Sequence, residues 1–391
     1  MTPEELNFLF SEEGCAWLDE VAAAGVTPQN HLQIASRLRK QLEPEQAQAV
    51  IETVRLRQRA ADKFSRAAQM FFTRAALEQA SMEIVARYRA GRFADMEYMQ
   101  IVDLGCSIGG DALALAETAS VTGVDWDPVR IIMAQENVRV YEVGDRFRGL
   151  ITDIQELTPF PADAIFFDPA RRDEQGRRFF SVRQYQPPLA VIDRWRDKVR
   201  GAAVKISPGV DYAELPPDAN VEFISVAGDV KEAALWYGEL KTGPPRRATL
   251  LPAGMSLTTD DLPDAEIPLA EPGPYLYEPD GAVIRAHLVA AAAARIGAAQ
   301  IDREIAYLTG ETAVADPFVR TFPIVDWFPF QLKRLRSYLR ERGVGRVTVK
   351  KRGSPITPEE LQQQLRLKGD PHNHRVIFLT QVAGQPAVLI S

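Results

Sequence analysis

The sequence predicts an α/β protein, in which a doubly wound parallel sheet with covering helices lies between a helical N-terminal region and a small α+β C-terminal module. Three observations predict this class. Apolar residues recur at intervals of three and four up to about Gly91, which is the period of helices. Short apolar runs then alternate with helix-like stretches after Gln100. The end of the chain has the pattern of a strand, a helix and a hairpin.

The N-terminal region, residues 1–95, is expected to be helical because strand and turn signals are almost absent before Gly91. Its first helix begins with a capping signal, since Thr2 is followed three residues later by Glu5.

The central region, residues 96–270, carries the apolar runs of a parallel sheet, whose strands are buried on both faces. The expected strands are Ile101–Gly105, Val121–Asp127, Phe147–Ile154, Asp163–Pro169 and Ala202–Gly209. Residues 221–240 predict two antiparallel strands joined by a turn at Gly228 and Asp229. A Pro/Gly-rich passage follows, and it predicts a small β extension and a linker.

The C-terminal module, residues 271–391, is expected to begin with helix from about Asp280 to about Leu308. The alanine-rich run at residues 288–299 is interrupted by Arg295, which favours a tightly packed helix over a membrane span. A strand, a helix and a hairpin are expected to complete the module.

Composition limits the class of protein. The chain has 391 residues and a net charge of −7, so any surface that binds nucleic acid has to be local. Its two cysteines, Cys15 and Cys106, lie far apart, which argues against a disulfide framework and a metal site. No apolar run is long enough to span a membrane, and a cytoplasmic location is expected. The sequence leaves the oligomeric state open.

A glycine loop follows the first expected strand and has the spacing Asp103-x-Gly105-x-x-x-Gly109, with Ser107 inside it. Glycine allows positive φ, and the following helix start offers N–H groups to a ligand. The dinucleotide fingerprint has a different spacing. Asp103 would disfavour a pyrophosphate and favour a cationic amino-acid group. The alternative is a plain strand-to-helix turn without a ligand.

Two further strand ends carry acids. Asp125 comes 20 residues after Gly105, where an acid usually receives ribose hydroxyls. Asp153 can accept a hydrogen bond from an adenine amino group, and Trp126 can cover the adenine, although simple packing explains Trp126 about as well. A nucleoside that carries a charged amino acid is S-adenosylmethionine, which is therefore the expected cofactor.

The order of these segments resembles the class I S-adenosylmethionine-dependent methyltransferases over roughly residues 100–240. The resemblance implies a Rossmann-like, seven-stranded sheet. Residues 63–81 resemble the arm that precedes the core in trimethylguanosine synthase-like methyltransferases. Lys63, Phe64, Phe71 and Thr73 could close over the cofactor, although the helical spacing of Phe64 and Phe71 favours packing in the core. The C-terminal segments resemble the THUMP-like domain that follows this kind of core in a group of bacterial proteins.

The fourth expected strand ends in Asp168-Pro169-Ala170-Arg171. Amino-directed methyltransferases have Asp, Asn or Ser here, followed by Pro-Pro and an aromatic residue. Asp168 is therefore expected to accept a hydrogen bond or a proton from the methyl acceptor, and Pro169 to stiffen the loop. Arg171 stands where the aromatic residue is found, so base stacking and an amino nitrogen as the target are both in doubt.

Three basic features complete the site hypothesis. Arg171 and Arg172 could stack on a base or bind a phosphate, or belong to a solvated, ion-paired loop. Lys205, at the end of the fifth strand, could pair with Asp168, contact substrate, or extend from the sheet edge to water. Residues 331–375 contain twelve Lys and Arg against four acids, which indicates a local RNA-binding surface or a solvated helix face.

The sequence therefore predicts a methyltransferase that acts on RNA, ribosomal or transfer, with a C-terminal module that positions it. The alternatives are a methyltransferase of protein or a small molecule, and an RNA-binding protein that keeps the cofactor without turnover.

Overall fold

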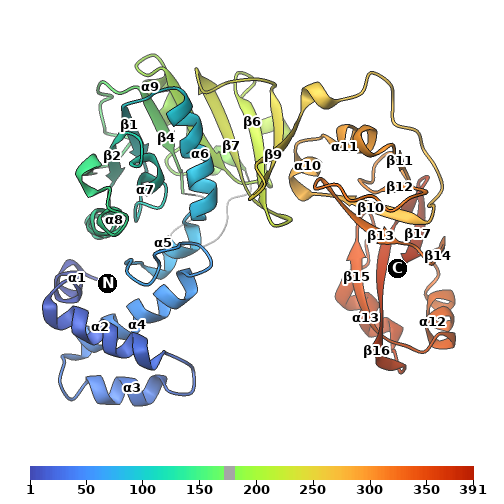
Figure 1. Ribbon diagram of the computed structural model, residues 1–391, viewed down its shortest axis with the longest axis horizontal. Helices are drawn as coiled ribbons and strands as arrows, with labels where there is room; N and C mark the ends of the chain where they lie inside the picture. Colours follow the sequence, from blue (N-terminus) through green and yellow to red (C-terminus); the bar gives the residue numbers. More distant parts are fainter. Residues whose placement is uncertain (171–180) are drawn as a thin grey trace. The chain divides into compact units, whose positions relative to one another are not determined.

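The computed structural model describes residues 1–170 and 181–391 of the chain. Contacts divide the chain into two compact units (Figure 1). The first consists of Met1–Asn220 and Glu232–Gly243, and the second of Val221–Lys231 and Pro244–Ser391. In the described residues, no helix has the length and apolar character needed to cross a membrane.

The N-terminal region is helical, as predicted. Its helices are α1 (Pro3–Leu9), α2 (Glu12–Ala24), α3 (His31–Leu38), α4 (Pro44–Ala60), α5 (Arg74–Gln79) and α6 (Glu83–Asp95). The capping box of Thr2 and Glu5 starts α1. Helices α1, α2 and α3 pack on α4, and their buried Leu, Ile and Val side chains join the core that includes α6 and the first strands.

The five expected parallel strands are all present. They are β1 (Gln100–Leu104), β2 (Ser120–Asp125), β3 (Phe147–Ile151), β4 (Ala164–Phe167) and β5 (Gly201–Ile206). In the first unit the strand order is β3-β2-β1-β4-β5-β7, where β7 (Asp229–Gly238) is antiparallel to β5. Helices α7 (Ala112–Leu115) and α8 (Pro128–Val140) pack against β2, and α8 also packs against β3. The carboxyl ends of the parallel strands therefore share one edge.

The whole sheet has nine strands in the described residues, two more than the resemblance implies. The additional strands are β8 (Arg246–Leu251) and β9 (Met255–Thr258), which arise in the passage where a small β extension was expected. In the second unit, β8 pairs in parallel with β6 (Asn220–Val226) and antiparallel with β9. Between β4 and β5, the short helix α9 (Asp193–Arg196) carries the buried Trp195.

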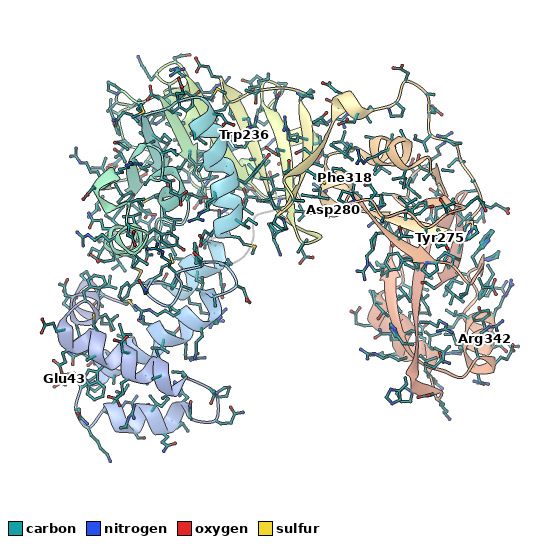
Figure 2. All side chains as sticks on the ribbon, in the orientation of Figure 1. Glu43, Trp236, Tyr275, Asp280, Phe318 and Arg342 are labelled. Carbon is teal, nitrogen blue, oxygen red and sulfur yellow. The ribbon has the colours of Figure 1, made fainter. Side chains whose placement is uncertain are left out.

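The expected helix from Asp280 to Leu308 is shorter and broken in two. Helix α10 (Gly281–Arg285) begins after Asp280, which is labelled in Figure 2. The Asp280 carboxylate accepts a hydrogen bond from the N–H of Ala282 at 2.8 Å. Helix α11 (Val289–Ile296) ends because Gly297 adopts the left-handed conformation, with φ +64°. The short strands β11 (Ala299–Gln300) and β12 (Leu308–Gly310) follow and pair with each other.

The C-terminal part contains two four-stranded sheets, ordered β11-β12-β10-β13 and β14-β17-β16-β15. The remaining elements are β10 (Tyr275–Pro279), β13 (Val319–Pro323), β14 (Asp326–Pro329), α12 (Leu332–Glu341), β15 (Val344–Lys351), α13 (Pro358–Leu365), β16 (Asp370–Val382) and β17 (Gln385–Ile390). The predicted strand, helix and hairpin correspond to β15, α13 and β16–β17. Helices α12 and α13 pack together and each contacts β15.

Candidate active site

The loop after β1 folds tightly, and its glycines explain how. Gly105 and Gly109 have φ of +81° and +79°, and Ser107 has φ of +48°. A Cβ atom on Gly105 would lie 2.9 Å from the backbone oxygen of Asp168, and one on Gly109 would lie 3.2 Å from the Cβ of Ala134. Both the conformation and the close neighbours therefore require glycine at these positions.

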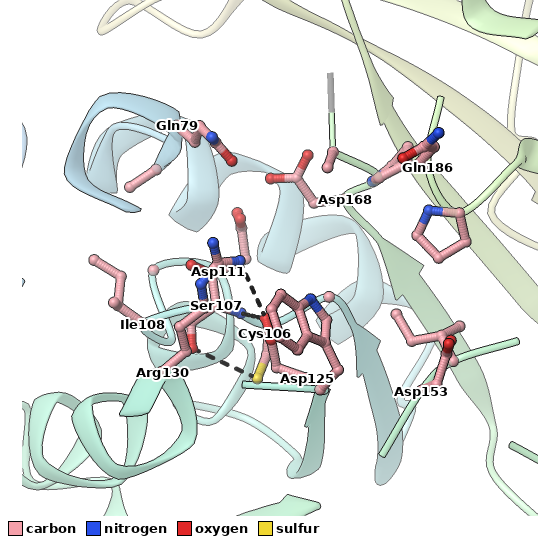
Figure 3. Close-up of a pocket in the computed structure, with 18 of the residues that line it drawn as sticks. Gln79, Cys106, Ser107, Ile108, Asp111, Asp125, Arg130, Asp153, Asp168 and Gln186 are labelled. Carbon is pink, nitrogen blue, oxygen red and sulfur yellow. Dashed lines mark hydrogen bonds and ion pairs between the residues drawn. The ribbon is translucent and has the colours of Figure 1, made fainter. Parts of the chain in front are cut away.

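A pocket lies against this loop, and Figure 3 shows side chains from several strand ends around it. The predicted site residues that line the pocket are Gly105, Ser107, Asp125, Trp126, Asp153, Asp168 and Pro169. The structure thus brings together residues from the ends of β1, β2, β3 and β4 at the sheet edge where open α/β proteins bind ligands.

Asp125 ends β2 and is only 3% exposed. One carboxylate oxygen accepts a hydrogen bond from the N–H of Ser107 at 3.0 Å, and the other accepts one from the N–H of Asp127 at 3.0 Å. The Nη1 atom of Arg130 lies 3.8 Å from Oδ2 of Asp125. Burial raises the pKa of Asp125, while these hydrogen bonds and Arg130 oppose the rise. The carboxylate is therefore fixed in orientation beside the pocket.

The side chains of Trp126 and Asp153 lie at the open side of the pocket. Trp126 is 69% exposed, so packing in the core does not account for it. Asp153 is exposed, and one of its oxygens accepts a hydrogen bond from the N–H of Gln155 at 2.8 Å. Both side chains can reach a ligand without displacing core contacts.

Asp103 lies within β1, two residues before Gly105, and is 1% exposed. Neither of its carboxylate oxygens has a hydrogen-bond partner in the described part of the chain. Burial raises the pKa of Asp103 well above its usual range, and the nearby carboxylates of Asp111 and Asp168 raise it further. A buried acceptor without a donor is costly, and a cationic ligand group would relieve that cost.

Arg89, on α6, is the centre of a buried ion-pair network that the sequence did not reveal. It is 2% exposed and forms ion pairs with Asp111, before α7, and with Glu232, in β7. The Ser81 hydroxyl donates to Asp111 at 3.1 Å, and the Arg89 guanidinium lies 4.7 Å from the centre of the Phe166 ring. The network links the arm, the glycine loop and the sheet.

Asp168 directly follows β4 and pairs with Lys205 of β5. The Lys205 Nζ atom lies 2.6 Å from Asp168 Oδ2 and 3.2 Å from the backbone oxygen of Gln79. The Lys205 side chain is 3% exposed and that of Asp168 is 20% exposed. The interpretation that Lys205 pairs with Asp168 is confirmed. Asp168 and Gln79 both line the pocket (Figure 3).

A second wall of the pocket was not predicted. The backbones of Ala170 and Gln186 form two hydrogen bonds of 2.9 and 3.3 Å, which bring Gln186 and Pro187 to the pocket beside Asp168. Arg171 and Arg172, for which roles were predicted, lie outside the described part of the chain.

The arm lines the pocket with Glu78, Gln79 and Ala80 rather than with the predicted Thr73. Thr73 caps α5, where its hydroxyl accepts a hydrogen bond from the N–H of Ala76 at 3.2 Å, and it is not among the described residues that line the pocket. The Lys63 ammonium donates to the backbone oxygens of Leu77 and Ala80 at 2.7 and 2.9 Å. Lys63 thus fixes the end of α5, which carries Gln79 into the pocket.

Sequence-family models match three parts of the chain. A model described as RNA cap guanine-N2 methyltransferase matches residues 98–186, and a model described as THUMP domain-like matches residues 319–391. Residues 2–60 match a domain of unknown function, DUF8688. The domain ranges expected from the sequence, 1–95, 96–270 and 271–391, stay predictions.

Relatives extend over most of the chain. Uncharacterised S-adenosylmethionine-dependent methyltransferases from two Mycobacterium tuberculosis strains, CDC 1551 and H37Rv, are each 38% identical over 336 residues, which is 82% of this chain and 89% of theirs. The crystal structure of a putative methyltransferase from Porphyromonas gingivalis W83 shares the fold, with a TM-score of 0.71 at 20% identity, over 93% of this chain and 98% of that one. The chain therefore belongs to the S-adenosylmethionine-dependent methyltransferases, with a core of the RNA cap guanine-N2 methyltransferase type and a C-terminal THUMP-like domain.

Proposed function

We propose that this methyltransferase methylates RNA, and that the methyl acceptor lies beside Asp168. The observation that carries the proposal is the pair of Asp168 and Lys205 at the edge of a pocket that also contains the glycine loop and Asp125. On this proposal the cofactor and the methyl acceptor bind in one cavity, as methyl transfer between two bound molecules requires.

The residues fit S-adenosylmethionine. Asp103 has two buried oxygens without donors in the described residues, which suits the cationic amino-acid end of the cofactor. Gly105 and Gly109 allow the tight turn that brings Gly105 and Ser107 to the wall of the pocket. We assign Asp125 to the ribose hydroxyls. Asp153 and the exposed Trp126 would hold the adenine, by a hydrogen bond and by stacking.

Asp168 is the group that would handle the acceptor. Bound S-adenosylmethionine supplies an electrophilic methyl group, so the protein has to orient the nucleophile and accept its proton. The 2.6 Å contact with Lys205 holds one oxygen of Asp168 in place, and its other oxygen is available to a hydrogen bond from the acceptor. Pro169 and the backbone of Ala170, tied to Gln186, restrict the loop around it.

The RNA part of the proposal has two supports. Two of the three matching family models describe an RNA cap guanine-N2 methyltransferase and a THUMP-like domain. In addition, most of the twelve basic side chains in residues 331–375 are exposed to solvent. Lys350 and Arg352 differ, because both contact Glu278. The net positive surface would attract the phosphate backbone of RNA, ribosomal or transfer.

Incubation with methyl-labelled S-adenosylmethionine tests the proposed substrate class. The full-length protein is given unmodified total RNA, a protein extract and a small-molecule extract in separate reactions. We expect label in RNA with the wild type and with the control Asp264→Ala, an exposed acid in the second unit, and its loss with Asp168→Ala. Label confined to protein or small molecules would contradict RNA as substrate. Binding of cofactor and RNA without transfer would favour a protein without turnover.

A further inference from the structure

A second pocket, in the THUMP-like domain, is lined by four cationic side chains. It lies between the end of α12, the start of β15 and the loop that joins α13 to β16. The cations are Arg336, Arg340, Arg366 and Lys368, and the other lining residues are Gly343, Val344, Leu365, Leu367 and Gly369. No carboxylate stands among these lining residues, so the local charge is strongly positive.

Close backbone packing fixes the frame of this pocket. A Cβ atom on Gly369 would lie 2.3 Å from the backbone oxygen of Gly343, and one on Gly345 would lie 2.4 Å from that of Asp370. The turn between α12 and β15 is therefore in direct contact with the loop between α13 and β16. The N–H of Asp370 donates a hydrogen bond to the backbone oxygen of Gly343 at 3.1 Å. Such a frame fixes the backbone from which Arg366 and Lys368 extend, so less chain entropy is lost on association than with a flexible loop.

The four cations are not neutralised by neighbouring acids. None of them forms an ion pair with a carboxylate in the described part of the chain. The Nε–H of Arg336 donates instead to the backbone oxygen of Gln364 at 2.7 Å. The acids that follow in the sequence have other partners. Glu341 accepts from the Ser337 hydroxyl at 2.9 Å, and Asp370 accepts from the N–H of His372 at 2.8 Å. Like charges gathered without counter-charge create a site that an anion would stabilise.

We propose that this pocket binds a backbone phosphate of the RNA substrate and so fixes the RNA on the C-terminal module; this rests on the proposed function. Guanidinium groups match the geometry of phosphate oxygens and bind them through paired hydrogen bonds. The exposure of Arg340, Arg366 and Lys368 leaves their charged groups accessible to a polyanion. The remaining basic residues of the module would add attraction without a fixed position.

Two substitutions remove a pocket charge with little effect on folding. Arg340 is exposed on α12, and glutamine has nearly the same helix propensity as arginine, which makes Arg340→Gln a mild change. Arg366 ends α13 with φ +48°, a conformation that glycine adopts freely, so Arg366→Gly removes the guanidinium without strain. The matched control is Lys333→Gln, an exposed lysine on the same helix that does not line the pocket.

Fluorescence anisotropy with a labelled single-stranded RNA of mixed sequence, titrated with each full-length variant at several salt concentrations, measures the effect. We expect Arg340→Gln and Arg366→Gly each to weaken binding about tenfold, as loss of a charge-assisted hydrogen bond does. Each should also reduce the slope of log affinity against log salt concentration by about one, as expected for the loss of one phosphate contact. Lys333→Gln should change affinity by about twofold or less, because a solvated charge acts only through the screened general field.

Equal losses for the pocket variants and the control would overturn the proposal, because the RNA would then respond only to net charge. Competition by inorganic phosphate with no effect of the variants on RNA affinity would also overturn it. This measurement is separate from methyl transfer. If labelled methyl fails to enter RNA while the pocket variants still weaken RNA binding, the proposed reaction fails and the pocket assignment stands.

Discussion

The Nζ atom of Lys205, in β5, lies 2.6 Å from Oδ2 of Asp168, which directly follows the neighbouring parallel strand β4. Phe167, the last residue of β4, is in register with Val204 of β5. The residues that follow them, Asp168 and Lys205, therefore lie side by side at the carboxyl edge of the sheet. This pairing holds the carboxylate at the rim of the pocket, and the function of the site is predicted to depend on it.

Lys205→Met should reduce methyl transfer more than it reduces stability. A methionine fills the volume of the buried lysine. The side chain of Asp168 is 20% exposed and can be solvated after its cation is lost, so the loss of stability should be smaller than the ~3–5 kcal/mol expected for a fully buried pair. Asp168 would lose its fixed orientation, which should lower kcat about tenfold or more while the Kd for the cofactor changes little. Single-turnover kinetics and calorimetry measure the two quantities. The control Lys231→Met removes an exposed partner of Asp229 and should leave both unchanged.

Gly105→Ala should abolish cofactor binding. The residue has φ +81°, and an added Cβ would lie 2.9 Å from the Asp168 backbone oxygen, so the loop has to move. We expect a loss of about 1–3 kcal/mol in the free energy of unfolding from the backbone strain. Gly91→Ala is the control, because Gly91 is exposed in α6 with no atom near its Cβ position. It should stabilise the helix by roughly 0.5–1 kcal/mol. Equal cofactor affinity in the two variants would disprove the role of the loop.

Arg89→Met should destabilise the fold strongly. It leaves the carboxylates of Asp111 and Glu232 in a buried position without their cation, and breaking such pairs costs about 3–5 kcal/mol. Arg37→Met, at an exposed pair with Glu20, should change the free energy of unfolding by less than about 1 kcal/mol. Urea unfolding of both variants provides the comparison. A small effect of Arg89→Met would mean that the network does not support the site.

Asp103 should make the stability of the protein without cofactor fall as the pH rises. Its pKa is raised in the folded state, so folded Asp103 keeps its proton when unfolded Asp103 releases it, above about pH 4. The stabilisation is complete below that pH and is lost as the pH rises toward the folded pKa. The slope from this group is at most about 1.4 kcal/mol per pH unit.

Asp103→Asn removes that slope and keeps the shape of the side chain. Urea unfolding of the wild type and the variant from pH 4 to pH 8 therefore isolates Asp103 from the neighbouring charges of Asp111, Asp125, Asp168 and Arg89. Parallel pH profiles for the two proteins would contradict the assignment of Asp103 as a buried, protonated acid.

The sequence predicted most of the fold, because each strand of the first unit is a short apolar run and each turn carries a local signal. It also predicted the glycine loop and Asp125, whose spacing is local. The ends of the apolar runs also predict Asp168 and Lys205 as strand-end residues, whereas the choice among the roles of Lys205 requires the structure.

Other parts of the site depend on contacts between distant residues. Arg89 and Glu232 are far apart in sequence, and no pattern around either of them indicates the other. Gln186 reaches the pocket only through its backbone bonds to Ala170. The hydroxyl of Thr73 is used for helix capping, a role that competes with ligand binding for the same residue type.

The most direct test of the account compares Asp168→Ala with the wild type in two measurements on one preparation: the Kd for S-adenosylmethionine by calorimetry, and the single-turnover rate of methyl transfer to RNA. We predict a Kd within about threefold of the wild type and a transfer rate lower by about 100-fold or more, which corresponds to roughly 2.7 kcal/mol in the barrier. Transfer to RNA at the wild-type rate by Asp168→Ala would contradict the placement of the acceptor beside Asp168.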